Sequence, residues 1–424
     1  MDLTKADAEA VKTRHKDAAG RMEQLRGRNL SLDMTRGKPS PEQLDLADDL
    51  LTIVKPGEAT SEDGTDLRNY GGLAGIPEAR RLFAEFLGTV SEQVIIGGNS
   101  SLTMMWDVLA NAMSYGVPDG EGLWRDQSPK FICPVPGYDR HFAICERLGI
   151  EMIAVEMTED GPDLDAIRAL VADDASVKGI WCVPKYSNPS GETYTDETVE
   201  ALATMDAAAK DFRIMWDNAY AVHHLGKGPA TLSDIMKACE KAGNPNRAVV
   251  FGSTSKITHA GAGVAVMASS QDNVKDHLEK IFFAMIGPDK INQLRHVRFF
   301  KDMNGILEHM NKHAEIVAPK FAAVEDALQK SLSGTGLATW TTPEGGYFVS
   351  VDVLDGCAKK VIQLCADAGV KITPAGATYP YGKDPHDRNI RIAPTLPSVD
   401  EIKVAMTVLT AAIEEVCTEK LLKD

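Results

Sequence analysis

Several features of specialised proteins are missing from this 424-residue sequence. No apolar run approaches the roughly 20 residues that a transmembrane helix needs, and the acidic N-terminus lacks the apolar core of a signal peptide. There is no dense run of lysine or arginine, and the formal net charge of −16 argues against a nucleic-acid-binding surface. We therefore expect a cytoplasmic protein with neither a membrane nor a nucleic-acid partner.

Cysteine is sparse and scattered. The chain has seven, an odd number, and none forms a C-x-x-C pair. This spacing is typical of reduced thiols rather than of a disulfide framework, and we expect no metal site. The remaining composition, 44% hydrophobic and 25% charged, is ordinary for a globular protein, and the length indicates two domains or more.

Short apolar, β-branched runs alternate with helical patterns from about residue 93 onward. Each run ends in a polar or glycine-rich turn; the runs lie at 94–96, 131–133, 152–156, 179–183, 213–216 and 249–251. This alternation predicts an α/β fold with a mostly parallel sheet that is covered on both faces. Because ligands bind outside the carboxyl ends of such strands, the turns are the candidate site.

The rest of the chain predicts a smaller α+β unit. We expect helices at 3–27, from 77, from 271, at 358–368 and from 399, and strands at 345–351 and 389–393. The predicted division is an N-terminal segment that joins the small domain (1–50), a large α/β domain (51–310) and a small C-terminal α+β domain (311–424).

Lys256 directly follows the strand predicted at Ala248–Phe251. Burial at the end of a strand lowers the pKa of a lysine and makes its amine a nucleophile for imine chemistry. Ser253 and Ser255 flank Thr254 and can donate hydrogen bonds to a phosphate. The combination suggests pyridoxal phosphate (PLP), although an exposed lysine after a strand is the simpler reading of this segment alone.

Asp217, Tyr220 and Asn188 lie in two other turns at strand ends. A carboxylate at Asp217 can keep a pyridine nitrogen protonated, which makes the ring an electron sink. Tyr220 and Asn188 can donate to the phenolic oxygen of the cofactor. The alternatives are a helix N-cap for Asp217, a packed core position for Tyr220 and a turn position for Asn188.

Three further features fit the same ligand. Gly97–Ser101, with Ser100 and Ser101, precedes a helix and can cradle a phosphate, although a plain capping turn has the same pattern. Tyr138 can stack on a planar ring or simply pack. Arg391 interrupts an apolar strand and needs an anion, either a substrate carboxylate or an internal Asp or Glu.

Together these motifs resemble the class I aminotransferases, PLP enzymes of fold type I. The resemblance rests on Asn188-Pro-Ser-Gly, Asp217-x-x-Tyr220, Ser253-x-Ser-Lys256 and a late Arg391, and it extends back to the Arg36-Gly37 segment. The turn at 134–141 and the segment at 33–39 look most like a divergent bacterial aspartate aminotransferase subgroup, which is similar to part of MocR-type proteins.

The resemblance implies a role for each candidate residue. Lys256 would carry the cofactor and move the proton between the substrate Cα and the cofactor, Asp217 would hold the pyridinium, and Asn188 with Tyr220 would hold the phenolic oxygen. Arg391 would bind the substrate α-carboxylate, with Gly37 closing over it. Tyr138 would stack on the cofactor ring. Ser100, Ser101, Ser253 and Ser255 would bind the phosphate, and so would Tyr70 from the neighbouring subunit of a homodimer. The Asn188-Pro189 bond would be cis.

The predicted reaction is ping-pong amino transfer between an amino acid and a 2-oxo acid, with L-aspartate and 2-oxoglutarate as the expected pair. Arg36, Lys38 and Arg140 are equal candidates for the second carboxylate. No arginine follows Lys256 to neutralise the phosphate; His259 or additional hydroxyls are the alternatives. A broad-specificity or aromatic aminotransferase stays open, as do Cα–S lyase chemistry and a non-catalytic ligand sensor.

Overall fold

A computed structural model describes residues 1–226 and 228–424. Its centre is an eight-stranded sheet with the strand order β2-β9-β8-β7-β6-β3-β4-β5. The five strands from β8 to β4 are parallel to one another, whereas β9 and β5 run antiparallel to their neighbours. The predicted α/β class and the six predicted strands of this sheet are confirmed to within a few residues: β2 (Val94–Ile96), β3 (Lys130–Val135), β4 (Glu151–Thr158), β6 (Val177–Cys182), β7 (Arg213–Asp217) and β8 (Ala248–Ser253). The sequence did not predict β5 (Gly161–Pro162) or β9 (Ala265–Ser269).

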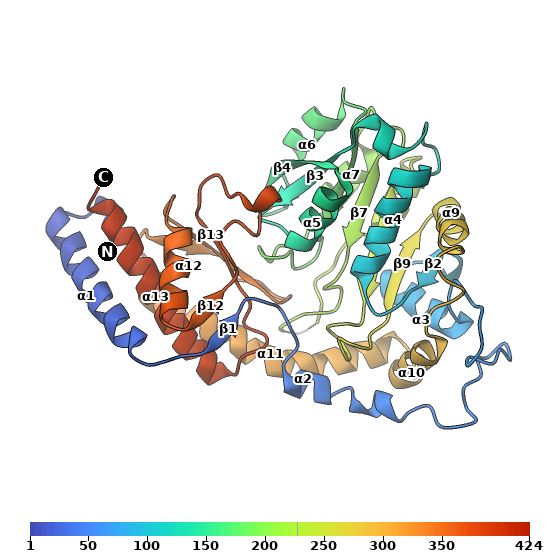
Figure 1. Ribbon diagram of the computed structural model, residues 1–424, viewed down its shortest axis with the longest axis horizontal. Coiled ribbons are helices and arrows are strands. Elements are labelled where there is room, and N and C mark those ends of the chain that lie inside the picture. The colour runs from blue at the N-terminus through green and yellow to red at the C-terminus, as the bar shows by residue number, and fades with distance from the viewer. Residues whose placement is uncertain (227) are drawn as a thin grey trace.

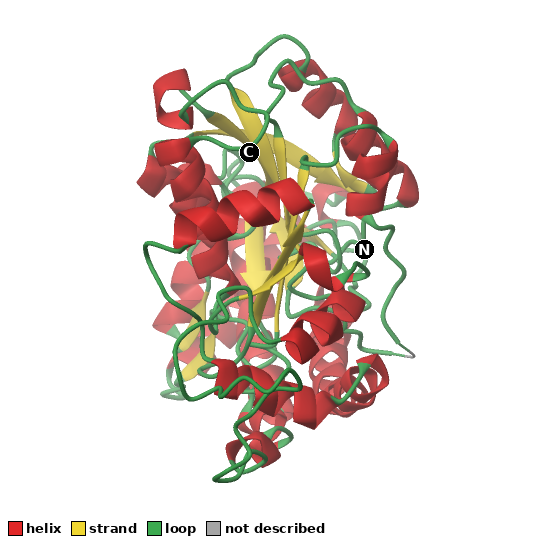
Figure 2. Cartoon of the chain, turned by 90° about the vertical axis from the view of Figure 1, so that its right-hand side faces the viewer, coloured by secondary structure: helices red, strands yellow, loops and turns green. Residues whose placement is uncertain are grey.

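Both faces of this sheet are covered by helices, as Figure 2 shows for the strands at the centre of the molecule. In β7, Ile214 and Trp216 pack into the core on one face, whereas Met215 packs into the core on the other. This alternation follows from the period of two along a strand, and it explains why the strands read as continuous apolar runs. The covering helices are α3 (Pro77–Leu87), α4 (Ser101–Tyr115), α5 (Asp139–Leu148), α6 (Leu164–Val171), α7 (Asp196–Thr204), α8 (Ile235–Lys241), α9 (Gln271–Ile281) and α10 (Lys290–Phe300).

A second hydrophobic core lies beside the first and joins the two ends of the chain (Figure 1). It contains a three-stranded antiparallel sheet, β10-β11-β13, and a parallel pair between β1 near the N-terminus and β12 near the C-terminus. Its elements are α1 (Ala8–Arg26), β1 (Leu32–Met34), α2 (Pro41–Asp45), α11 (Met303–Leu332), β10 (Ala338–Trp340), β11 (Val349–Val353), α12 (Ala358–Asp367), β12 (Val370–Ile372), β13 (Asn389–Ile392) and α13 (Val399–Leu421).

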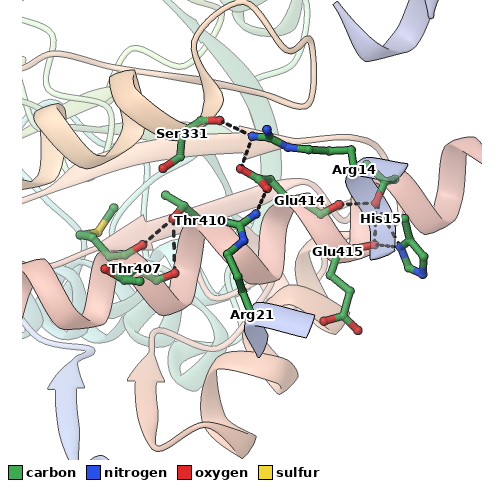
Figure 3. Close-up of polar contacts among 10 residues, drawn as sticks. Arg14, His15, Arg21, Ser331, Thr407, Thr410, Glu414 and Glu415 are labelled. Carbon is green, nitrogen blue, oxygen red and sulfur yellow. Dashed lines mark hydrogen bonds and ion pairs between the residues drawn. The ribbon is translucent and has the colours of Figure 1, made fainter. Parts of the chain in front are cut away.

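An ion-pair cluster attaches α1 to α13 (Figure 3). The Glu414 carboxylate on α13 is fully buried and pairs with Arg14, at 2.6 Å, and with Arg21. Arg14 also donates to the carbonyl of Ser331 on α11, at 3.1 Å. His15 lies 3.1 Å from the carbonyl of Glu415, which can only accept, so the His15 Nδ1 is the donor. These contacts fix the first helix to the second core.

The division into domains stays a prediction. The predicted boundary between residues 310 and 311 falls inside α11, a single 30-residue helix. Ile306 and Met310 of this helix pack against the large sheet, whereas Val317 and Phe321 pack into the second core. The helix therefore connects the two cores rather than separating them.

Two predicted elements differ from the structure. The helix predicted at 3–27 is a short 3-10 turn, Leu3–Lys5, followed by α1, because the side chain of Asp7 accepts from the amide of Ala10 and starts a new helix. The strand predicted from residue 345 begins only at Val349. Gly346 has a φ of +80° and donates to the carbonyl of His223, so residues 345–348 form a bend. No helix in the part of the chain that the structure describes is both long and apolar enough to span a membrane.

Candidate active site

A cavity of about 630 Å³ lies at the carboxyl ends of β6, β7 and β8, against the second core. It brings together residues that are up to 356 positions apart in sequence, from Thr35 to Arg391. Eleven of the twelve site residues predicted from the sequence line this cavity: Gly37, Ser100, Ser101, Tyr138, Asn188, Asp217, Tyr220, Ser253, Ser255, Lys256 and Arg391.

Lys256 follows β8, is half-buried and lines this cavity. Its Nζ lies 5.1 Å from the centre of the Tyr220 ring. Loss of hydration lowers the pKa of Lys256, and the charge of Asp217 opposes that shift. Lys256 is therefore not the fully exposed lysine of the simpler reading, and its amine is more readily neutral, and so more readily nucleophilic, than that of an exposed lysine.

Asp217 ends β7 and presents one carboxylate oxygen without a partner. Its Oδ2 lies 3.0 Å from Nε2 of His141, whereas Oδ1 is buried and has no hydrogen-bond partner within the described residues. The chain continues from Asp217 as a turn, so the N-cap alternative is wrong. No role was predicted for His141, whose only sequence signal is its place three residues after Tyr138. In the structure its ring stacks on Trp181, with 4.1 Å between the ring centroids.

Arg391 has one of the two partners that the sequence left open, an internal carboxylate, and keeps one nitrogen unpaired. Its Nη1 lies 2.9 Å from Oδ1 of Asp139 and 3.3 Å from Oδ1 of Asn188. Its buried Nε has no partner in the described structure, and the guanidinium lies over the Phe348 ring at 4.9 Å. Because Asp139 occupies one nitrogen only, the Nε edge can still bind a carboxylate.

Asn188 is held in one orientation by this contact. Since its Oδ1 accepts from Arg391, its NH2 group is the side that can donate to a ligand. The peptide bond between Asn188 and Pro189 is cis, as predicted. Tyr220 is buried and Tyr138 is half-buried in the same cavity, and loss of hydration raises the pKa of both phenols, so each hydroxyl stays a protonated donor.

Hydroxyl groups collect at one end of the cavity. Ser100 is the N-cap of α4 but its side chain makes no capping bond, and Ser101 begins the helix. Ser253 lies beside them at the end of β8, and Ser255 donates to the carbonyl of Asn99 at 2.9 Å. Free hydroxyls at the start of a 15-residue helix form a suitable site for a phosphate.

Three cationic side chains also line the cavity. Arg36, Lys38 and Arg140 reach the cavity and form no ion pair within 1–226 and 228–424. Gly37 lies between the first two, where a Cβ would come within 2.7 Å of the Phe348 ring. Only glycine therefore allows this segment to approach the cavity so closely.

Two predicted participants lie elsewhere. The Tyr70 side chain is 81% exposed and is not part of the cavity of this chain, and its predicted role in a neighbouring subunit stays a prediction. The His259 ring lies 3.3 Å from Asp48 and is also outside the cavity lining. His259 therefore does not replace the missing arginine in this arrangement, which leaves the hydroxyls as the remaining alternative.

The geometry fits the predicted cofactor. PLP needs an amine, an acceptor for its pyridinium N–H, a donor for its phenolic oxygen and a phosphate site. The cavity offers the half-buried Lys256, the unpartnered Oδ1 of Asp217, the oriented amide of Asn188 and the serine hydroxyls. An unpaired buried carboxylate oxygen is costly in a folded protein, and a cofactor N–H would remove that cost.

Comparison with known sequences points in the same direction. The profile of the aspartate amino-transferase family matches residues 6–424. An aspartate aminotransferase from Corynebacterium glutamicum is 48% identical over 420 residues, which are 98% of this chain and 97% of the relative.

Solved structures agree. The crystal structure of an aspartate transaminase from Corynebacterium glutamicum is 47% identical and superposes with a TM-score of 0.97 over 99% of both chains. The α-aminoadipate aminotransferase of Thermus thermophilus, solved with N-(5′-phosphopyridoxyl)-L-leucine, is 20% identical; it covers 96% of this chain and 97% of its own with a TM-score of 0.74, and shares the fold.

Proposed function

The chain belongs to the aspartate aminotransferase family, and on this premise we propose that it moves the amino group of L-aspartate to 2-oxoglutarate by a ping-pong mechanism. It is a PLP-dependent aminotransferase. The observation that carries the proposal is that one cavity contains both the half-buried amine of Lys256, whose pKa is lowered, and an unpartnered carboxylate oxygen of Asp217.

The residues proposed to hold the cofactor would contact its ring nitrogen, its phenolic oxygen and its phosphate. When bound, PLP supplies an electron sink for the negative charge that develops at the substrate Cα. Asp217 accepts the ring N–H, and Asn188 with Tyr220 donates to the phenolic oxygen. Tyr138 covers the ring, and the phosphate contacts are Ser100, Ser101, Ser253 and Ser255.

Lys256 acts as the base in this proposal. Burial lowers its pKa, so a larger fraction of its amine is neutral near pH 7 than for an exposed lysine. The neutral amine of Lys256 would accept the proton from the substrate Cα and hold it for return during the transfer of the amino group, for which bound PLP would supply the electron sink. His141 helps to keep Asp217 in place, because it binds Oδ2 and is itself held flat against Trp181.

Substrate recognition follows from the two cationic regions of the cavity. The free edge of Arg391 matches the α-carboxylate with two parallel hydrogen bonds, and Gly37 lets the N-terminal segment approach it. A dicarboxylate needs a second cation, and Arg36, Lys38 and Arg140 are available for it. The names of the relatives support aspartate as the amino donor.

We also propose that the active site is shared within a homodimer. Tyr70, Phe282, Phe283 and Ile286 are exposed, and Lys290 connects their segments because its Nζ donates to the carbonyls of Asn69 and Gly71, both at 2.8 Å. A second copy would cover this apolar surface and receive Tyr70 near its phosphate. The seven buried thiols support the proposed cytoplasmic location.

An absorbance experiment tests the activity. The purified protein, loaded with PLP, is mixed with L-aspartate alone, and the visible cofactor band is expected to disappear and to return on addition of 2-oxoglutarate. L-phenylalanine serves as the matched amino acid without a second carboxylate and is expected to react far more slowly. A band that responds to phenylalanine but not to aspartate would contradict the specificity, and the absence of a band would contradict the function.

A further inference from the structure

A buried hydrogen-bond network lies directly behind Lys256. The carbonyl of Lys256 accepts from the Tyr347 hydroxyl at 3.1 Å, and the carbonyl of Ile257 accepts from Nε2 of His309 at 2.7 Å. Tyr347 comes from the bend before β11, and His309 comes from α11. Two successive peptide groups at the reactive lysine are thus held by side chains from other elements.

Gln43 of α2 connects these donors. Its Oε1 accepts from the backbone N–H of Ser40 at 3.0 Å, which fixes the orientation of the amide. The two N–H groups of Gln43 therefore face Tyr347 Oη and Nδ1 of His313, both at 3.1 Å. Gln43 is fully buried, so both of these donors need their partners.

The positions of the protons in the network follow from the acceptors. A carbonyl can only accept, so His309 carries its proton on Nε2. The Nδ1 of His313 accepts from Gln43, and the Nε2 of the same ring lies 3.1 Å from Nε2 of His309. Burial lowers the pKa of His309, and it lowers the pKa of His313 to about 3, so both rings are neutral. Tyr347 receives a hydrogen from Gln43 and gives its own to Lys256.

The same two segments also reach the substrate side of the cavity. The N-terminal segment that carries Gln43 also carries Gly37, and the bend that carries Tyr347 also carries Phe348, which lies over Arg391. One set of contacts therefore spans from the proposed carboxylate-binding edge to the backbone of Lys256.

We propose that Gln43, Tyr347, His309 and His313 are positioning residues that set the direction of the Lys256 side chain from behind its backbone. The inference rests on the proposed role of Lys256. These residues touch neither substrate nor cofactor; they act through the peptide groups of residues 256 and 257. The N-terminal segment and the reactive amine are thereby coupled.

Tyr347→Phe and Gln43→Leu test this proposal in the PLP-loaded protein. Tyr347→Phe removes two hydrogen bonds of the network, and Gln43→Leu removes three. We expect kcat to fall by about three- to tenfold or more in each variant, while KM for L-aspartate stays within about twofold. The pH midpoint of the visible cofactor band is expected to move by about half a unit. Because both residues act through one chain of bonds, the double variant should be little worse than the more severe single variant.

Tyr379→Phe is the matched control, because Tyr379 is a buried tyrosine outside the cavity lining with no contact to Lys256. It should leave kcat and the pH midpoint unchanged. If Tyr347→Phe lowers only the thermal midpoint, or if the two single effects add fully, the network is structural and the inference is wrong. A wild-type protein without a visible band would contradict the proposed function instead, so the two failures are distinguishable.

Discussion

Glu414 provides a test of how the N-terminal helix is attached. The carboxylate is 0% exposed and has two cationic partners, whereas the side chains of Arg14 and Arg21 are 39% and 42% exposed. Figure 3 shows this cluster. If its partner is removed, each arginine can still be hydrated because it is partly exposed, whereas the buried carboxylate cannot.

This difference sets the expected magnitudes. Replacing both arginines by methionine keeps most of the apolar stem but leaves a buried charge without a partner, which costs about 3–5 kcal/mol of the free energy of unfolding. Glu414→Gln keeps the shape and leaves the arginines to water, so it should cost only about 1–3 kcal/mol. Adding Glu414→Gln to the double arginine variant should remove the unpaired charge and recover part of the lost stability.

Urea denaturation of the cofactor-saturated protein measures the change in the overall free energy of unfolding. Hydrogen exchange of the α1 amides measures the local change, which is needed because a chain with two hydrophobic cores can unfold in parts. We expect faster exchange in α1 for the double arginine variant than for Glu414→Gln. If Glu414→Gln is the more destabilising change, or if it weakens the arginine-free variant further, the argument from burial is wrong.

Three further predictions concern the site. Asp217→Asn, which keeps the shape but removes the charge, should lower kcat about 100- to 1,000-fold in steady-state assays; an unchanged kcat would exclude its role at the ring nitrogen. Arg391→Lys cannot form two parallel hydrogen bonds, so KM for L-aspartate should rise about 10- to 100-fold with the spectrum of the cofactor unchanged. Mixing Tyr70→Ala with Lys256→Ala protein should restore activity that neither variant has alone, because one hybrid site would contain both native residues; no recovery after verified subunit exchange would contradict a shared site.

Local patterns predicted most of the large sheet and its ligand site. Strands such as Arg213–Asp217 are apolar on both faces of the large sheet, which makes them easy to recognise in the sequence. The strands from β8 to β4 are parallel, so the polar residues at their carboxyl ends lie at the same edge of the sheet. Lys256, Asp217 and Asn188 could be found in this way. Each follows a strand, and the topology brings them together.

The remaining contacts depend on residues far apart in the chain. His141 binds Asp217 across 76 positions, and Asp139 binds Arg391 across 252. His309 lies in the first third of a long helix, where a histidine on an apolar face gives no sequence signal of its carbonyl partner. The bend at 345–348 was predicted as a strand because its alternating pattern resembles one, while the positive φ of Gly346 depends on its contact with His223.

The central claim is that Lys256 carries the cofactor in this cavity. Borohydride reduction of the PLP-loaded protein fixes the bond between lysine and cofactor, and peptide mass spectrometry then locates the added pyridoxyl phosphate group. We expect the group on Lys256 and its loss in Lys256→Ala. A group on another lysine, such as the buried Lys185 whose pKa is lowered to about 8, would contradict the claim.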